Sequence, residues 1–353
     1  MKNENRLTDL ARTLSVQTAS YKTKKMIRFI KNEVAKIPGC VVHEEHENIY
    51  VTKGEAETYP CIVAHTDTVH NLVKNFRIFR NDDTLFSIDG DTMERVGIGG
   101  DDKVGVFIAL EVLRNVDVCK AAFFRDEEVG CKGSGDADMK WFDNVEFALQ
   151  CDRKGSSDFV DNISGTQMYD KSFSNAISAI LDKYGRKEVD GGLTDVCQLV
   201  DNGLKVCAAN MSCGYYDPHT DNEYVIISEV MATLDMVLEM FEALAGQMWE
   251  VKDEERTIYN PAGGYGGGSW NWGGWNSRNF SGGKDEEILE HLPGACCSEC
   301  GTENVGYDEF EDVYYCFNCD MYLHPMCVED FEEDEDGDIF DDPSDLNLME
   351  REV

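Results

Sequence analysis

The stretch from Gly97 to Gly130, GIGGDDKVGVFIALEVLRNVDVCKAAFFRDEEVG, contains two acidic pairs separated by a helix and a strand pattern. The first pair, Asp101–Asp102, precedes an apolar run from Val104 to Val116 that predicts a helix. A short strand, Ala121 to Phe124, then leads to the second pair, Glu127–Glu128. A helix followed by a strand returns the chain to the sheet edge that it left, so both pairs can meet there. Clustered carboxylates raise one another's pKa and cost stability, so we expect a bound cation or a shared proton.

The composition argues against several classes of function. The chain of 353 residues has a formal net charge of −37, so direct binding to nucleic acid through phosphate contacts is not expected. No apolar run approaches the roughly 18 residues of a membrane span, and the first 20 residues do not form a signal peptide. Cysteines before residue 250 lie mostly in apolar runs, as Cys61, Cys151 and Cys207 do. We therefore expect a cytoplasmic protein with buried thiols, no disulfide framework and no membrane partner.

Strands and helices alternate along the first 250 residues. Helical apolar spacing marks Lys22 to Ile37, Ser172 to Tyr184, Thr194 to Asp201 and Ser228 to Leu244. Buried-strand patterns lie between such helices, and this alternation predicts an α/β sheet covered on both faces. In open α/β sheets the site forms beyond the carboxyl ends of the strands. The polar residues that follow predicted strands are His65, Asp67, His70, Glu127, Glu128, Asp152 and His219.

Two imidazoles and three carboxylates form a donor set that suits a pair of zinc-like divalent ions with one carboxylate between them. Such ions polarise a carbonyl and lower the pKa of a bound water. Asp67 is placed to hold the imidazole of His65, and Glu127 is free to act as a general base if Glu128 binds metal. Each residue also has an ordinary explanation, such as a helix N-cap at Asp101–Asp102 or a core histidine at position 65. The candidate ligands are His65, Asp101, Glu128, Asp152 and His219.

Five motifs, in order, resemble those of the dinuclear zinc exopeptidases. The likeness is greatest to peptidase T and its relatives among carboxypeptidases and acylamino-acid deacylases. It covers roughly residues 5 to 247. The motifs are HTDTV from His65, GGDDKVG at Gly99–Gly105, DEEVG at Asp126–Gly130, CDRKG at Cys151–Gly155 and GYYDPHTDNEYV at Gly214–Val225.

The resemblance implies a ligand assignment for two zinc ions. Asp101 would bridge the two ions. His65 and Asp152 would complete one site, and Glu128 and His219 would complete the other. A hydroxide held between the ions would attack the peptide bond.

The resemblance also implies supporting roles. Glu127 would be the general base, and Asp67 would support the first histidine. The peptide bond after Asp101 would be cis. Asp195 and Glu223 match positions that support the ligands, although less securely.

One feature departs from the family pattern. Peptidase T and its kin carry a lid or dimerisation domain after the position of Asp152, but only 66 residues separate Asp152 from His219 here. We therefore expect a catalytic domain without a lid and without its clamp for a substrate carboxylate. Tyr215 or Tyr216 is either a group that polarises the carbonyl or a packing residue. The carboxylates expected at the open rim are Asp67, Asp102, Glu127 and either Asp217 or Asp221.

A negative rim attracts a free α-ammonium group and repels a terminal carboxylate. The expected function is therefore a metallopeptidase that removes amino-terminal residues from short peptides. Two alternatives stay open. One is a carboxypeptidase or N-acyl-amino-acid deacylase of the same family. The other is a non-enzymatic acidic interaction protein on a decayed peptidase scaffold.

From Val251 the sequence changes in character. Residues 251–290 contain the glycine- and tryptophan-rich run Asn260 to Gly283, which predicts a flexible linker. Residues 291–330 contain two C-x-x-C pairs separated by 15 residues, a spacing typical of a structural zinc site. We predict a zinc ribbon-like module whose ligands are Cys297, Cys300, Cys316 and Cys319.

His324 and Cys327 are either ligands of an altered or second zinc site, or ordinary residues of this module. Residues 331–353 predict an acidic disordered tail. The ribbon and the tail are candidate contacts for a protein partner. The predicted fold is therefore a three-layer αβα zinc-exopeptidase domain over residues 1–250, with a mixed, mostly parallel sheet, followed by the small ribbon.

Overall fold

The computed structural model describes residues 2–163 and 165–251, together with short strands in the residues that follow. The chain divides into two compact units, residues 1–259 with 340–353, and residues 260–339. The first unit contains all the residues predicted for the catalytic site. In the part of the chain that is described, no helix is both long enough and apolar enough to cross a membrane.

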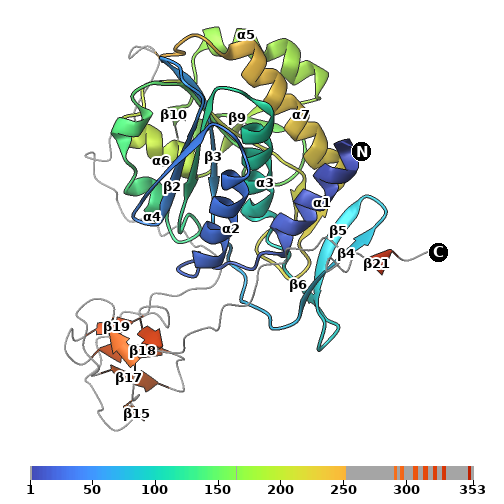
Figure 1. The fold of residues 1–353 in the computed structure, drawn as a ribbon, viewed down its shortest axis with the longest axis vertical. Helices are drawn as coiled ribbons and strands as arrows, with labels where there is room; N and C mark the ends of the chain where they lie inside the picture. Colours follow the sequence, from blue (N-terminus) through green and yellow to red (C-terminus); the bar gives the residue numbers. More distant parts are fainter. Residues whose placement is uncertain are drawn as a thin grey trace. The chain divides into compact units, whose positions relative to one another are not determined.

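A mixed sheet of nine strands forms the centre of the first unit (Figure 1). Its strands are β1 (Cys40–Glu45), β2 (Asn48–Lys53), β3 (Tyr59–His65), β7 (Cys119–Phe124), β8 (Val145–Gln150), β9 (Asp158–Ile163), β10 (Thr166–Gln167), β11 (Lys187–Gly191) and β12 (Ala208–Met211). Their order in space is β1-β2-β7-β3-β8-β12-β9-β10, with β11 paired to β9. The central strands β7, β3, β8 and β12 run parallel to one another. The predicted α/β class is therefore confirmed.

Helices cover both faces of this sheet (Figure 1). They are α1 (Lys2–Ser15), α2 (Lys24–Ala35), α3 (Gly100–Asn115), α4 (Lys132–Gly135), α5 (Lys171–Lys183), α6 (Asp195–Asp201) and α7 (Ile227–Leu244). On one face α3 packs against β3 and β7, and α1, α2 and α7 pack against α3. On the other face α6 packs against β3, β8 and β12, with α4 beside it.

A smaller sheet lies beside the large one in the first unit. Its strands are β4 (Phe76–Asn81), β5 (Thr84–Asp89), β6 (Arg95–Val96), β13 (Tyr215–Tyr216), β14 (Tyr224–Ile226) and β21 (Met349–Glu350). Their order is β13-β14-β5-β4-β21, and β6 pairs with β5. Because β13 and β14 pair antiparallel, the loop between them projects from this sheet. That loop carries His219.

Helix α3 begins irregularly and then becomes fully buried. Gly99 before it has a positive φ of 66°, and Asp101 and Asp102 have non-helical dihedral angles. The Asp101–Asp102 peptide bond is cis, as the family resemblance implied. Residues 102–113 are buried, because α3 lies between the large sheet and the outer helices. The run Val104–Leu110 within this helix is apolar on all sides, as is expected in such a position.

Three parallel strands deliver polar residues to one edge of the large sheet. β3 ends at His65, β7 ends just before Glu127–Glu128, and β8 ends just before Asp152. Parallel pairing places the carboxyl ends of these strands side by side. The described residues between Asp152 and His219 form β9 to β13 with α5 and α6, and they form no separate lid domain.

The second unit contains two small sheets. Its strands are β15 (Glu290–His291), β16 (Ala295–Cys297), β17 (Val305–Asp308), β18 (Val313–Cys316), β19 (Met321–Leu323) and β20 (Val328–Asp330). Cys297 and Cys316 are the last residues of β16 and β18. The other predicted zinc ligands, Cys300 and Cys319, lie outside the described residues, as do His324, Cys327 and the glycine-rich linker. The zinc ribbon stays a prediction.

Candidate metal centre

The five predicted ligands meet at the carboxyl edge of the large sheet. The two oxygens of Asp101 face different histidines: Oδ1 lies 3.3 Å from Nε2 of His65, and Oδ2 lies 3.3 Å from Nε2 of His219. Oδ1 of Asp152 lies 3.7 Å from Nε2 of His65. Oε2 of Glu128 lies 3.1 Å from Nε2 of His219. The donors therefore form two groups that share the Asp101 carboxylate.

The donor atoms fit a pair of metal ions in spacing and in chemistry. In a tetrahedral zinc site with bonds of about 2.0–2.1 Å, neighbouring donor atoms lie about 3.3 Å apart. Nε2 of His65 is buried and forms no hydrogen bond, and Oε1 of Glu128 is buried without a partner. Buried polar atoms are rarely left without hydrogen bonds. These two atoms therefore suit a ligand that the chain itself does not supply.

The electrostatics of the cluster also favour a cation. Burial, followed by the charge of Asp101, raises the pKa of Glu128 to about 7 and that of Asp152 to about 6. Contacts with Asp101 and Glu128 raise the pKa of His219 to about 10. Burial lowers the pKa of His65, but the surrounding carboxylates outweigh it and raise this pKa well above its ordinary value. The cluster thus has more negative charge than its two imidazoles balance.

Asp102 stabilises the backbone rather than completing the donor set. Donor atoms of His65, Asp102 and Asp152 also lie within 4.8 Å of one another. However, Oδ2 of Asp102 accepts a hydrogen bond from the backbone N–H of His65 at 3.1 Å, and Oδ1 accepts one from Gly105 at 2.9 Å. Both oxygens are therefore occupied, and the side chain is fully buried. Asp101 is the better candidate for the shared ligand.

Asp67 contacts both His65 and the next acidic loop. Its Oδ1 lies 3.3 Å from Nδ1 of His65 and accepts the backbone N–H of Glu127 at 3.0 Å. Its Oδ2 accepts a hydrogen bond from Ser20 at 2.8 Å. Burial raises the pKa of Asp67, but the His65 imidazole outweighs it and holds this pKa below its usual range. The imidazole is therefore oriented by Asp67 through its backbone carbonyl oxygen, 3.1 Å from Nδ1, as well as its carboxylate, and the carboxylate also fixes the backbone of Glu127.

Glu127 lies next to the donor cluster, but its carboxylate is further from His65 than those of Asp101 and Asp152 are. Its Oε2 lies 4.0 Å from Nε2 of His65, and its Oε1 accepts a hydrogen bond from Sγ of Cys131 at 3.5 Å. Burial raises the pKa of Glu127 well above its ordinary value, and the charge of Asp152 raises it further. A carboxyl group with a raised pKa next to a donor cluster is suited to proton transfer.

Several residues support the Asp152 carboxylate, and two of them, Thr194 and Gln150, were not assigned a role from the sequence. The Asp152 carboxylate accepts hydrogen bonds from Thr194 at 3.0 Å, from Tyr215 at 3.2 Å and from Gln150 at 3.3 Å. Gln150 is polar at the last position of a fully buried strand, and that pattern is a signal in the sequence. The Tyr215 hydroxyl donates to Asp152, so it supports a ligand instead of standing free at the opening. The Tyr216 hydroxyl donates to Glu229 at 2.8 Å.

Asp195 is a buried acid close to the residues that support Asp152. It is fully buried and accepts hydrogen bonds from Ser134 at 2.5 Å and from Gln150 at 3.3 Å. Burial raises its pKa to about 7. Through Gln150, Asp195 is connected to the carboxylate of Asp152.

The rim expected from the sequence needs a correction. Asp67 and Asp102 are fully buried, and their carboxylates accept hydrogen bonds from neighbouring backbone N–H groups and, for Asp67, from Ser20. They therefore do not belong to the rim. Asp217 and Asp221 are exposed on the loop that carries His219.

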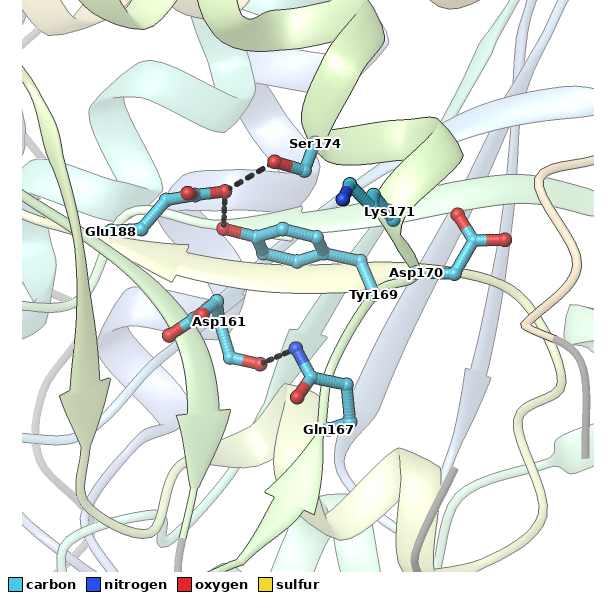
Figure 2. Close-up of a pocket in the computed structure, with 7 residues that line it drawn as sticks. All are labelled: Asp161, Gln167, Tyr169, Asp170, Lys171, Ser174 and Glu188. Carbon is cyan, nitrogen blue, oxygen red and sulfur yellow. Dashed lines mark hydrogen bonds between the residues drawn. The ribbon is translucent and has the colours of Figure 1, made fainter. Parts of the chain in front are cut away.

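A separate hollow of about 370 Å³ lies elsewhere in the first unit (Figure 2). Glu188 in this hollow accepts hydrogen bonds from Tyr169 at 3.1 Å and from Ser174 at 2.7 Å. The hollow contains no histidine and none of the predicted ligands, so we do not assign the predicted chemistry to it. Its lining residues are Asp161, Gln167, Tyr169, Asp170, Lys171, Ser174 and Glu188.

Among the comparisons with known proteins, the one with solved structures finds proteins similar to this chain. No protein-family model and no curated protein sequence matches the chain. Among solved structures, aminopeptidase PepT from Bacillus cereus ATCC 10987 is similar over 69% of this chain and 99% of its own, with 15% identity and a TM-score of 0.57. A tripeptidase from Staphylococcus aureus subsp. aureus Mu50 is similar over 69% of this chain and 98% of its own, with 14% identity and a TM-score of 0.55.

A third solved structure, of an archaeal protein, is also similar to this chain. The aminopeptidase APDkam598 from Desulfurococcus kamchatkensis is similar over 70% of this chain and 99% of its own, with 14% identity and a TM-score of 0.51. Identities this low establish the fold and not the activity. The first unit of this chain therefore has the fold of these aminopeptidases, with a buried cluster of histidine and aspartate side chains that can hold metal.

Proposed function

We propose that this chain is a metal-dependent aminopeptidase that hydrolyses short peptides. The observation that carries the proposal is the buried Nε2 atom of His65, which forms no hydrogen bond and lies among the carboxylates of Asp101 and Asp152. A decayed scaffold would have no reason to keep such an atom without a partner. The fold shared with known aminopeptidases supports the same reaction class.

We assign two divalent ions, with zinc as the favoured metal, to the two donor groups. His65, Asp101 and Asp152 would hold one ion, and Asp101, Glu128 and His219 would hold the other. The chemistry that such ions supply when bound is polarisation of the peptide carbonyl and acidification of the attacking water. Hydrogen bonds from Tyr215 and Thr194 keep the Asp152 carboxylate in place for this role.

Glu127 acts as the general base in this proposal. Its carboxylate takes a proton from the attacking water and passes it to the leaving amine. The contact with Cys131 fixes one oxygen, and the other oxygen faces His65. Asp67 holds both the imidazole of His65 and the backbone of Glu127, so the base and a ligand keep a constant separation.

The amino end of the substrate is the favoured point of attack. The exposed acids Asp217 and Asp221 flank His219 in the sequence, and their negative charge attracts an α-ammonium group and repels a terminal carboxylate. The described residues between Asp152 and His219 (153–163 and 165–218) form no lid domain to clamp a carboxylate. The acidic C-terminal residues and the predicted ribbon remain candidates for a protein partner.

One peptide series tests the proposal. A tripeptide is offered to the zinc-loaded full chain with a free or acetylated amino end and with a free or amidated carboxyl end. We expect acetylation to abolish cleavage and amidation to be tolerated, with Glu127→Gln inactive on every peptide. Cleavage that requires a free carboxyl end would instead assign a carboxypeptidase, and cleavage of the acetyl group a deacylase. No cleavage of any peptide by a metal-loaded chain would contradict enzymatic function.

A further inference from the structure

We infer that His70 is a positioning residue for the metal centre: through Glu223, it holds the turn that carries the shared ligand Asp101. The inference rests on the proposed metal centre and extends it to a residue that touches none of the five ligands directly. Three segments far apart in the sequence meet at this point. They are the loop after β3, the turn before α3, and the loop between β13 and β14.

Glu223 accepts hydrogen bonds from the backbone of the turn that carries Asp101. It is fully buried. Its Oε1 accepts the backbone N–H of Asp101 at 3.1 Å, and its Oε2 accepts the backbone N–H of Gly99 at 2.7 Å. Glu223 lies four residues after His219, and Arg95 fixes its backbone by donating to its carbonyl oxygen at 3.0 Å. One side chain therefore connects the loop of one predicted ligand to the turn of another.

His70 holds this carboxylate in place. Its Nε2 lies 2.7 Å from Oε2 of Glu223, and its backbone N–H donates to Oγ1 of Thr68 at 3.3 Å. Thr68 in turn donates to the carbonyl oxygen of Thr18 at 2.7 Å. Thr68 thus holds the backbone of His70, while Glu223 contacts its imidazole. If the imidazole is removed, Glu223 loses a hydrogen bond and gains space into which it can move.

Gly97 provides the space for the ring. A Cβ atom built on Gly97 would lie 1.9 Å from Cε1 of His70. Gly97 does not have a positive φ, so its backbone conformation does not require glycine. The position lacks a side chain because the His70 imidazole fills the place where one would lie. Gly97→Ala should therefore displace His70 without removing any hydrogen-bonding group.

The contact matters because the two oxygens of Asp101 must face His65 and His219 at the same time. The backbone N–H of Asp101 sets the direction of its side chain, and Glu223 holds that N–H. Loss of an outer contact to a metal ligand typically lowers metal affinity by about 10- to 100-fold. Because His70 acts on the ligand only through Glu223, we expect His70→Ala to lower metal affinity by about 10-fold, at the low end of this range, with less effect from His70→Gln, whose amide can still donate to Glu223.

The test is titration of the metal-free full chain with Mn²⁺ alone, because Mn²⁺ prefers carboxylate ligands to the thiolates of the C-terminal cysteine pairs. We expect His70→Ala and Gly97→Ala each to weaken Mn²⁺ binding by about 10-fold, and His70→Gln to retain most of the wild-type affinity. Gly135→Ala is the matched control, because a Cβ there meets nothing within 4 Å. Circular dichroism of each metal-free variant checks that the fold is retained.

The outcomes separate this inference from the proposed function. Unchanged Mn²⁺ affinity in folded His70→Ala, or a Gly97→Ala variant that behaves as Gly135→Ala does, would overturn the role of His70. If Gly97→Ala fails to fold, the comparison of His70→Ala with His70→Gln decides. A wild-type chain that binds Mn²⁺ but cleaves no peptide would contradict the peptidase and leave the His70 result valid. A wild-type chain that binds no Mn²⁺ would overturn both.

Discussion

Two clusters of buried charged side chains in the same unit differ in charge balance: basic side chains neutralise the acids of one cluster but not those of the other. Between α1, α2 and α3, the buried acids Glu33 and Glu111 both have basic partners. Glu33 lies 2.6 Å from Arg114 and 3.0 Å from Arg12, and Glu111 lies 2.8 Å from Arg114 and 3.3 Å from Arg6. At the edge of the large sheet, the ion pairs that the described residues offer to the cluster carboxylates Asp101, Glu128 and Asp152 are with histidines, namely His65 and His219.

The pKa values follow this difference. Burial raises the pKa of Glu33, but its hydrogen bond to Lys36 and the charges of Arg12 and Arg114 outweigh burial and lower it overall. Burial raises the pKa of Glu128 to about 7, and there the charge of Asp101 adds to it. A cluster that is neutralised by its own chain stabilises the fold. A cluster that is not neutralised favours a cation from outside, and this contrast is the main physical argument for a metal centre.

The largest expected effect concerns the base. Glu127→Gln keeps the shape of the side chain but cannot accept the proton. We expect the rate of peptide hydrolysis to fall by about 10²- to 10⁴-fold, while the metal content of the purified chain is unchanged. Activity and elemental analysis on the same sample check this. If metal content falls together with activity, the roles of Glu127 and Glu128 are exchanged.

A smaller effect is expected in the balanced cluster. Glu33→Gln removes the charge that Arg12 and Arg114 share, and we expect the free energy of unfolding to fall by about 1–3 kcal/mol at pH 7. Because the pKa of Glu33 is lowered in the folded chain, its contribution is present above its ordinary pKa and is lost as the pH falls through the folded value.

The difference between wild type and Glu33→Gln should therefore shrink in acid. Urea unfolding at pH 7 and near pH 3 measures it, and metal binding should be the same in both proteins. A difference that grows as the pH falls would contradict the assignment of Glu33 as a stabilising charge.

The smallest effect has the opposite sign. Glu128→Gln removes one repelling charge from the unbalanced cluster, so the metal-free variant should be more stable than metal-free wild type by about 1–2 kcal/mol at pH 7. With zinc added, the order should reverse, because the variant has lost a ligand. Thermal unfolding with and without zinc compares the two. A metal-free variant that is less stable than wild type would mean that Glu128 has a structural role.

Local pattern in the sequence predicts the elements with strong apolar spacing. The helix expected at Ser172–Tyr184 is α5 (Lys171–Lys183), and the final helix expected at Ser228–Leu244 is α7 (Ile227–Leu244). The small sheet was not predicted as a unit, because it joins the local hairpin of β4 and β5 to strands distant in sequence, as in the pairing of Phe86 in β5 with Tyr224 in β14. Two short strands of this kind have no local signal that identifies their partner.

At the site, too, local patterns can be predicted from the sequence and long-range contacts cannot. Placement of His65, Glu128 and Asp152 near one another follows from parallel strands and their carboxyl ends, which the sequence indicates. How deeply each acidic side chain is buried does not follow from the sequence, because no local pattern distinguishes Asp101 from its neighbour Asp102. Only the structure reveals that Asp102 is occupied by two backbone N–H groups. The contact of His70 with Glu223 joins positions 153 residues apart, so no local pattern could reveal it.

Metal content tests the central claim most directly. The full chain and the double variant His65→Ala/His219→Ala are purified with zinc and analysed for bound metal. The variant removes one ligand from each donor group and leaves the C-terminal cysteines intact, so metal in the second unit cancels in the difference. We predict that the variant contains about two fewer ions per chain than wild type. Equal metal content in the two proteins would contradict a dinuclear centre at the edge of the sheet.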